Sequence, residues 1–87
     1  MTTHETALPL QAAYLQALRA GSGRQADTII TQGLDSGWTA NDIYLQLFQP
    51  TAYEIGRLWQ RNEFSVAQEH LATAIIEREM GDLHTYF

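Results

Sequence analysis

Three residues in the second half of the sequence, Trp59, Glu69 and His70, are of types that can bind a ligand. A carboxylate and an imidazole exchange protons, ligate metals and form hydrogen bonds, and an indole offers a large flat apolar surface. Considered singly, the tryptophan and the histidine each have an ordinary structural explanation. Trp59 continues the apolar stripe of Ile55, and His70 shares a helix face with Val66, so both residues would pass as core residues.

Other kinds of chemistry find little support in the sequence. Neither His4 nor His84 stands three or four residues from His70, and the Glu-x-x-His pattern of di-iron bundles does not occur, so we expect no metal site built from protein ligands alone. Cysteine is absent, which removes thiolate ligands and cysteine nucleophiles. Ser65 is better explained as a helix cap than as a nucleophile. We interpret residues 77–79 (Glu-Arg-Glu) as solvated surface, and we expect no enzymatic activity from this chain.

The elements that would position these residues are helical throughout. Apolar residues recur at helical spacing from Leu8 to Leu18, with Pro9 near the start, and again after Ser22 until Gly37. Thr39 is a candidate cap for a third helix that reaches Trp59, and Ser65 for a fourth that extends towards the C-terminus.

The pattern predicts an all-α fold, an antiparallel four-helix bundle, because four amphipathic helices with short loops can bury their stripes only against each other. Pro50 lies inside the third helix. A proline there removes a backbone donor and presses on the carbonyl of Gln46, so we expect a kink near Pro50.

Length and charge limit the function classes. The 87 residues suit one compact domain, residues 1–87. Ten acidic residues face five arginines, giving a formal net charge of −5, which disfavours direct binding of nucleic acid. No apolar run is long enough to span a membrane, and we expect a cytoplasmic protein. The apolar end Thr85-Tyr86-Phe87 would suit either an interrupted linker or a contact between copies of the chain, and the second alternative implies a homo-oligomer.

Two segments carry a resemblance to a known family. Tyr53–Gln60 (YEIGRLWQ), preceded by Gln49-Pro50, and Asn62–Ala74 (NEFSVAQEHLATA) closely resemble the helical cap of cobalamin-binding modules. That cap precedes a Rossmann-like corrinoid-binding domain in cobalamin-dependent methionine synthase, in corrinoid methyl carriers and in adenosylcobalamin-dependent photoreceptors. The spacing Trp-x9-Glu-His, formed here by Trp59, Glu69 and His70, is most similar to the photoreceptors.

The resemblance implies a cofactor and a set of site residues. The cap would cover the upper axial face of adenosylcobalamin, with Trp59 over the group bonded to cobalt and with Glu69 and His70 hydrogen-bonded to an adenosyl group. Val66, one turn before His70, is assigned to the same site. The lower cobalt ligand would come from the Asp-x-His-x-x-Gly motif of the Rossmann-like domain, which this sequence lacks, so that domain is expected as a partner in cis or in trans. A light- or cofactor-responsive sensor or regulator is the function implied.

One departure and two alternatives accompany this hypothesis. Some photoreceptors of the family carry a histidine directly after the tryptophan, where this chain has Gln60, which argues against a photoproduct with two histidine ligands. The chain would alternatively be the cap of a corrinoid methyl carrier or methyltransferase, whose methyl group offers no hydrogen-bonding partner to Glu69 and His70. The third interpretation is a free-standing bundle that binds another ligand or a protein.

Overall fold

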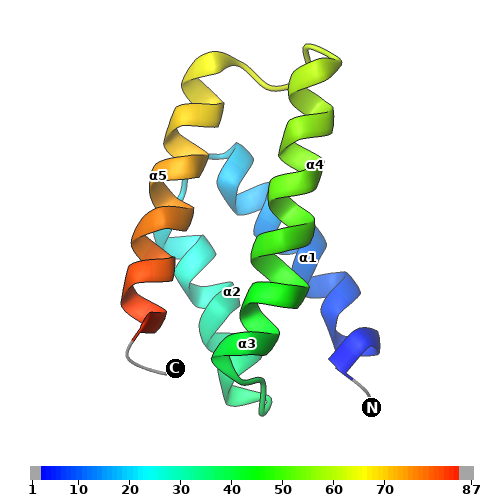
Figure 1. The fold of residues 1–87 in the computed structure, drawn as a ribbon, viewed down its shortest axis with the longest axis vertical. Coiled ribbons are helices and arrows are strands. Elements are labelled where there is room, and N and C mark those ends of the chain that lie inside the picture. The colour runs from blue at the N-terminus through cyan, green and yellow to red at the C-terminus, as the bar shows by residue number, and fades with distance from the viewer. Residues whose placement is uncertain (1–2, 85–87) are drawn as a thin grey trace.

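The computed structural model describes residues 3–84, and all regular secondary structure in this range is helical. The elements are α1 (Thr3–Arg19), α2 (Gly23–Asp35), α3 (Ala40–Ile43), the π-helical segment η1 (Tyr44–Phe48), α4 (Gln49–Gln60) and α5 (Val66–Leu83). Figure 1 shows that α3, η1 and α4 continue one another as a single rod, so the described chain forms an up-down-up-down bundle of four helical rods. This confirms the predicted all-α fold. No helix within the described range is both long and apolar enough to cross a bilayer.

Three of the helix starts are capped as the sequence predicts. The Ser22 hydroxyl accepts a hydrogen bond from the Gln25 backbone N–H at the start of α2. Thr39 with Asp42 forms a complete capping box, and so does Ser65 with Gln68 at the start of α5. Each box satisfies two backbone N–H groups that the first turn of a helix leaves without partners, which fixes where the helix begins.

The interruption expected near Pro50 takes the form of a π-helical turn. Gln49 donates its backbone N–H to the carbonyl of Tyr44, five residues earlier, and Pro50 then stands in the first turn of α4. Because proline has no N–H to continue the α-helical bonding pattern, the wider turn just before it lets the chain pass this residue without leaving the helix.

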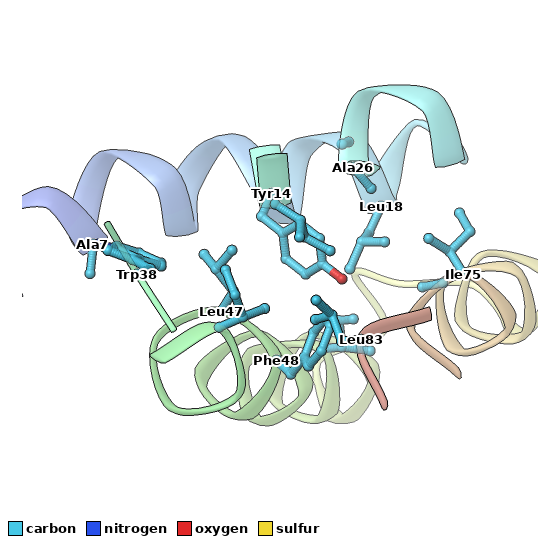
Figure 2. Close-up of a cluster of buried hydrophobic side chains, with 14 of the residues drawn as sticks. Ala7, Tyr14, Leu18, Ala26, Trp38, Leu47, Phe48, Ile75 and Leu83 are labelled. Carbon is cyan, nitrogen blue, oxygen red and sulfur yellow. The ribbon is translucent and has the colours of Figure 1, made fainter. Parts of the chain in front are cut away.

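A single hydrophobic cluster fills the bundle, with the fully buried ring of Tyr14 near its centre. Figure 2 shows this ring among Leu18, Leu47 and Phe48, with its hydroxyl directed to the side on which Ile75 lies. The ring centroids of Tyr14 and Phe48 are 6.1 Å apart. The cluster takes side chains from all four rods, and the Tyr14 ring of α1 meets the Phe48 ring of the third rod within it.

The apolar faces of α1 and α5 differ from those that helical spacing suggests. Leu8, at the start of the first predicted stripe, is 57% exposed, and Leu71, which we also expected in an apolar stripe, is 48% exposed. Glu79 was expected in solvent, and that prediction is wrong, because Glu79 is only 2% exposed. In α5 the buried residues are Ala72, Ile75, Glu79 and Leu83. A carboxylic acid thus occupies a core position of α5, and a pattern of apolar residues could not reveal it.

The second tryptophan of the chain, Trp38, anchors the turn between α2 and α3. Gly37 adopts a φ of 104°, which favours glycine, and the Trp38 indole then folds back onto Gly33. A Cβ on Gly33 would lie 2.9 Å from Trp38 Cε3, so the absence of a side chain there makes room for the ring.

Helix α1 holds the bundle together. It packs against α2, η1, α4 and α5, whereas the backbones of α4 and α5 come close at few positions although a short loop joins them. Figure 1 shows the upper turns of α4 and α5, with their loop, rising beyond the turn that connects α1 to α2. Residues 85–87, where a contact between copies was predicted, lie outside the described range.

Candidate functional site

The weak contact between α4 and α5 leaves a groove between them, of about 540 Å³. We call this hollow the α4–α5 groove. Its lining residues come from these two helices alone: Ala52, Ile55, Gly56, Trp59, Val66, Glu69, His70, Thr73 and Ile76. All four residues assigned to the cofactor by the sequence are therefore on its walls, although they belong to two different helices.

Trp59 lies one residue before the end of α4 and is 47% exposed. It is not a core residue, in contrast to Trp38, which is 6% exposed. The residue one turn earlier on the same face, Ile55, is buried. The apolar stripe of α4 thus runs out of the core and continues, at Trp59, as the wall of an open groove.

Glu69 and His70 lie near the start of α5, just after the Ser65 cap, which sets the position of this turn. Glu69 Oε1 accepts a hydrogen bond of 3.2 Å from the Thr73 hydroxyl, and Oε2 lies 3.9 Å from His70 Nδ1. The spacing of His70 from Val66 suggested a side chain that points into the bundle. The His70 side chain is instead 77% exposed. The two polar side chains lie together and are open to a ligand.

The charged and hydroxyl-bearing side chains of the groove all lie on the α5 wall, which we call the polar wall although Val66 and Ile76 also line it, and the α4 wall is apolar. Glu69, His70 and Thr73 of α5 supply carboxylate, imidazole and hydroxyl groups, while Ala52 and Trp59 of α4 supply methyl and indole surface. Val66 stands 55% exposed beside the polar wall. Mixed apolar and polar surfaces of this kind are typical of sites for organic cofactors.

Gln60 lies outside this groove. It lines a neighbouring hollow on α4 together with Tyr53 and Arg57, although Ala52 and Gly56 border both spaces. The residue directly after the tryptophan is thus on a different face from Glu69 and His70. Among the described residues, no group of three or more His, Cys, Asp or Glu side chains is placed to hold a metal ion.

A second polar cluster extends from the core of the bundle, at Tyr14 and Glu79, to its surface on the side of α2. The Tyr14 hydroxyl donates a hydrogen bond to Glu79, while Arg78 donates to both carboxylate oxygens of Asp27 at 2.9 and 3.1 Å and to Asp82 at 3.1 Å. Burial, together with the nearby Asp27, raises the pKa of Glu79 to about 8, although Tyr14 and Arg78 act to lower it.

This cluster leaves one buried atom without a partner. No hydrogen bond reaches Glu79 Oε2, and Asp27 raises the pKa of Glu79 as a nearby negative charge. Because its pKa is above neutrality, Glu79 is mostly protonated at pH 7, and a neutral acid is far easier to bury than a carboxylate. The cluster is separate from the α4–α5 groove and joins α1, α2 and α5.

Comparison with known protein families matches residues 10–83 to the family described as "B12 binding domain". The matched range includes both walls of the α4–α5 groove and most of α1, on which α4 and α5 pack. No curated protein matches the chain.

Proposed function

The chain belongs to the B12 binding domain family, and from this premise we propose that its α4–α5 groove covers the upper axial face of a cobalamin. The observation that carries the proposal is the convergence of Trp59, Glu69 and His70 on one groove. Trp59 supports it most directly, because its half-exposed indole is not needed to fill the core.

We propose adenosylcobalamin as the form bound. Glu69 and His70 present hydrogen-bonding groups beside the indole, and ribose hydroxyls and an adenine ring can pair with such groups, whereas a methyl group cannot. Adenosylcobalamin, when bound, would supply the chemistry of its cobalt–carbon bond. The residues of this chain orient the upper ligand: Thr73 holds the Glu69 carboxylate, and Trp59 keeps water from the apolar side of the groove.

The lower ligand, in this proposal, comes from a Rossmann-like corrinoid-binding domain in cis or in trans. The pair would act as a binding module of a light- or cofactor-responsive sensor or regulator, without catalysis by this chain. Since Gln60 stands in the neighbouring hollow and is not a histidine, we do not expect a bis-histidine photoproduct. The cap of a methyl carrier is the alternative, and preference for methylcobalamin over adenosylcobalamin would favour it.

The test combines the chain with a Rossmann-like corrinoid-binding domain and adenosylcobalamin in the dark. Cofactor retention and absorbance spectra are then compared for the wild type and for Trp59→Ala, Glu69→Gln and His70→Ala. Each variant has a control outside the α4–α5 groove. Glu77→Gln and His84→Ala change residues of the same type, and Tyr53→Ala removes another exposed aromatic side chain of α4. We expect loss of retention in the groove variants alone. Equal retention in all six variants would rule out the assigned roles.

A further inference from the structure

Gly56 is placed where the fold of this chain does not call for glycine. It lies in the interior of α4, where glycine is less favourable than alanine because it loses more backbone freedom on folding. A Cβ built on Gly56 meets nothing within 4 Å. Its φ is not positive, in contrast to those of Gly21 and Gly37. Neither packing within the chain nor backbone conformation therefore accounts for this residue.

The position of Gly56 suggests that a ligand outside the chain accounts for the glycine. It lies three residues before Trp59 and four after Ala52, and all three line the α4–α5 groove opposite Glu69 and His70. Along this part of the groove Ile55 is buried, so the exposed surface of α4 below the indole is the methyl group of Ala52 and the bare backbone of Gly56. A ligand lying against Trp59 can approach the helix axis at Gly56 more closely than at any residue with a side chain.

We infer that Gly56 is a contact position for the corrinoid, at which the absence of a side chain lets the bound group lie directly on the α4 backbone. This inference rests on the proposed function, because it assigns a residue within the same groove. It predicts two opposite effects of one substitution: Gly56→Ala should raise the stability of the free chain and lower the affinity of the complex for the cofactor.

The chain offers a matched control in Gly81. This glycine is also exposed and helical, in α5, and its Cβ would likewise meet nothing within 4 Å, but it does not line the α4–α5 groove. Gly56→Ala and Gly81→Ala should each raise the Tm of the free chain by roughly 2 to 8 °C, because both replace glycine by a better helix former.

The two glycines should differ in binding. With a Rossmann-like corrinoid-binding domain present, Gly56→Ala should weaken the affinity for adenosylcobalamin by about 5- to 100-fold, as expected for one extra group in a filled contact, and Gly56→Leu should weaken it further. Gly81→Ala and Gly81→Leu should bind as the wild type does. Circular dichroism melting and titration followed by absorbance give the two measurements.

The possible outcomes distinguish a failure of the Gly56 role from a failure of the proposed cobalamin binding. A wild-type chain that does not bind the cofactor overturns the proposed function and the role of Gly56 with it. A wild type that binds, with unchanged affinity in both Gly56 variants, overturns the role of Gly56 alone. Equal losses in the Gly56 and Gly81 variants, or a lower Tm for Gly56→Ala, would show that the effect does not arise in the groove, and would also overturn it.

Discussion

The hydroxyl of Tyr14 in α1 lies 2.5 Å from Glu79 Oε1 in α5 and donates a hydrogen bond to it, joining two residues that are 65 positions apart in the chain. Both residues are buried, at 0% and 2% exposure. The bond satisfies one oxygen of an acid that lies in the core and leaves the other without a partner. Two predictions depend on this pair.

The first concerns pH. The pKa of Glu79 is raised from 4.5 to about 8, so between these values the folded chain keeps a proton that the unfolded chain has lost. The free energy of unfolding should therefore fall as pH rises through this window, by up to about 1.4 kcal/mol per pH unit, and the fall should end above pH 8. Glu79→Gln should remove this slope, while Glu77→Gln, on the exposed face of α5, should keep it. Urea unfolding at pH 5, 7 and 9 tests this, and parallel profiles for all three proteins would contradict it.

The second concerns the donor. Tyr14→Phe keeps the aromatic ring in the core but leaves Glu79 Oε1 without its partner, so it should cost about 1 to 3 kcal/mol of unfolding free energy at pH 7. Tyr53→Phe is the control, because Tyr53 is 75% exposed on α4. Urea unfolding followed by circular dichroism measures both. A Tyr14→Phe variant as stable as Tyr53→Phe would mean that the hydrogen bond contributes nothing.

Substitution of each tryptophan should show that Trp38 stabilises the fold and that Trp59 does not. Trp38→Ala empties a buried site and should cost about 3 to 5 kcal/mol, because Trp38 is 6% exposed and packs on Gly33. Trp59→Ala should change the stability of the free chain by less than about 1 kcal/mol, although it removes a wall of the α4–α5 groove. Thermal melting of both variants without cofactor decides this, and a large loss for Trp59→Ala would make the residue structural.

The N-terminal cap of α5 should stabilise the helical turn that carries Glu69 and His70. Ser65→Ala removes a hydroxyl that accepts a hydrogen bond of 3.0 Å from the Gln68 backbone and should cost about 1 kcal/mol. Because Glu69 and His70 follow directly, their amide protons should also exchange faster with solvent. Ser65→Asp retains an acceptor and should behave as the wild type does. Unchanged hydrogen exchange at Glu69 and His70 in Ser65→Ala would mean that the cap does not stabilise this part of the site.

The helices could be predicted from the sequence because their limits depend on local chemistry. Ser22, Thr39 and Ser65 each bond to a backbone group three residues away, so the residues that cap a helix are visible in the sequence beside it. The burial of Glu79 could not be predicted in this way. It depends on Tyr14 and Asp27, which come from α1 and α2, and no spacing within α5 reveals them.

The site was predicted for a different reason. Trp59 and His70 look like core residues by periodicity, and only the resemblance to a cobalamin-binding cap indicated that they face a ligand. The structure brings them together and shows that both are open to solvent. Gly56 was not singled out, because a glycine inside a helix becomes informative only when the space around its missing side chain is known.

The packing of α4 and α5 on α1, rather than on each other, has a consequence for how such a pocket changes over evolution. Both wall helices pack on α1, but no residue of α1 lines the groove. A substitution on α1 that moves α4 relative to α5 would therefore change the width of the groove while all of its lining residues stay the same.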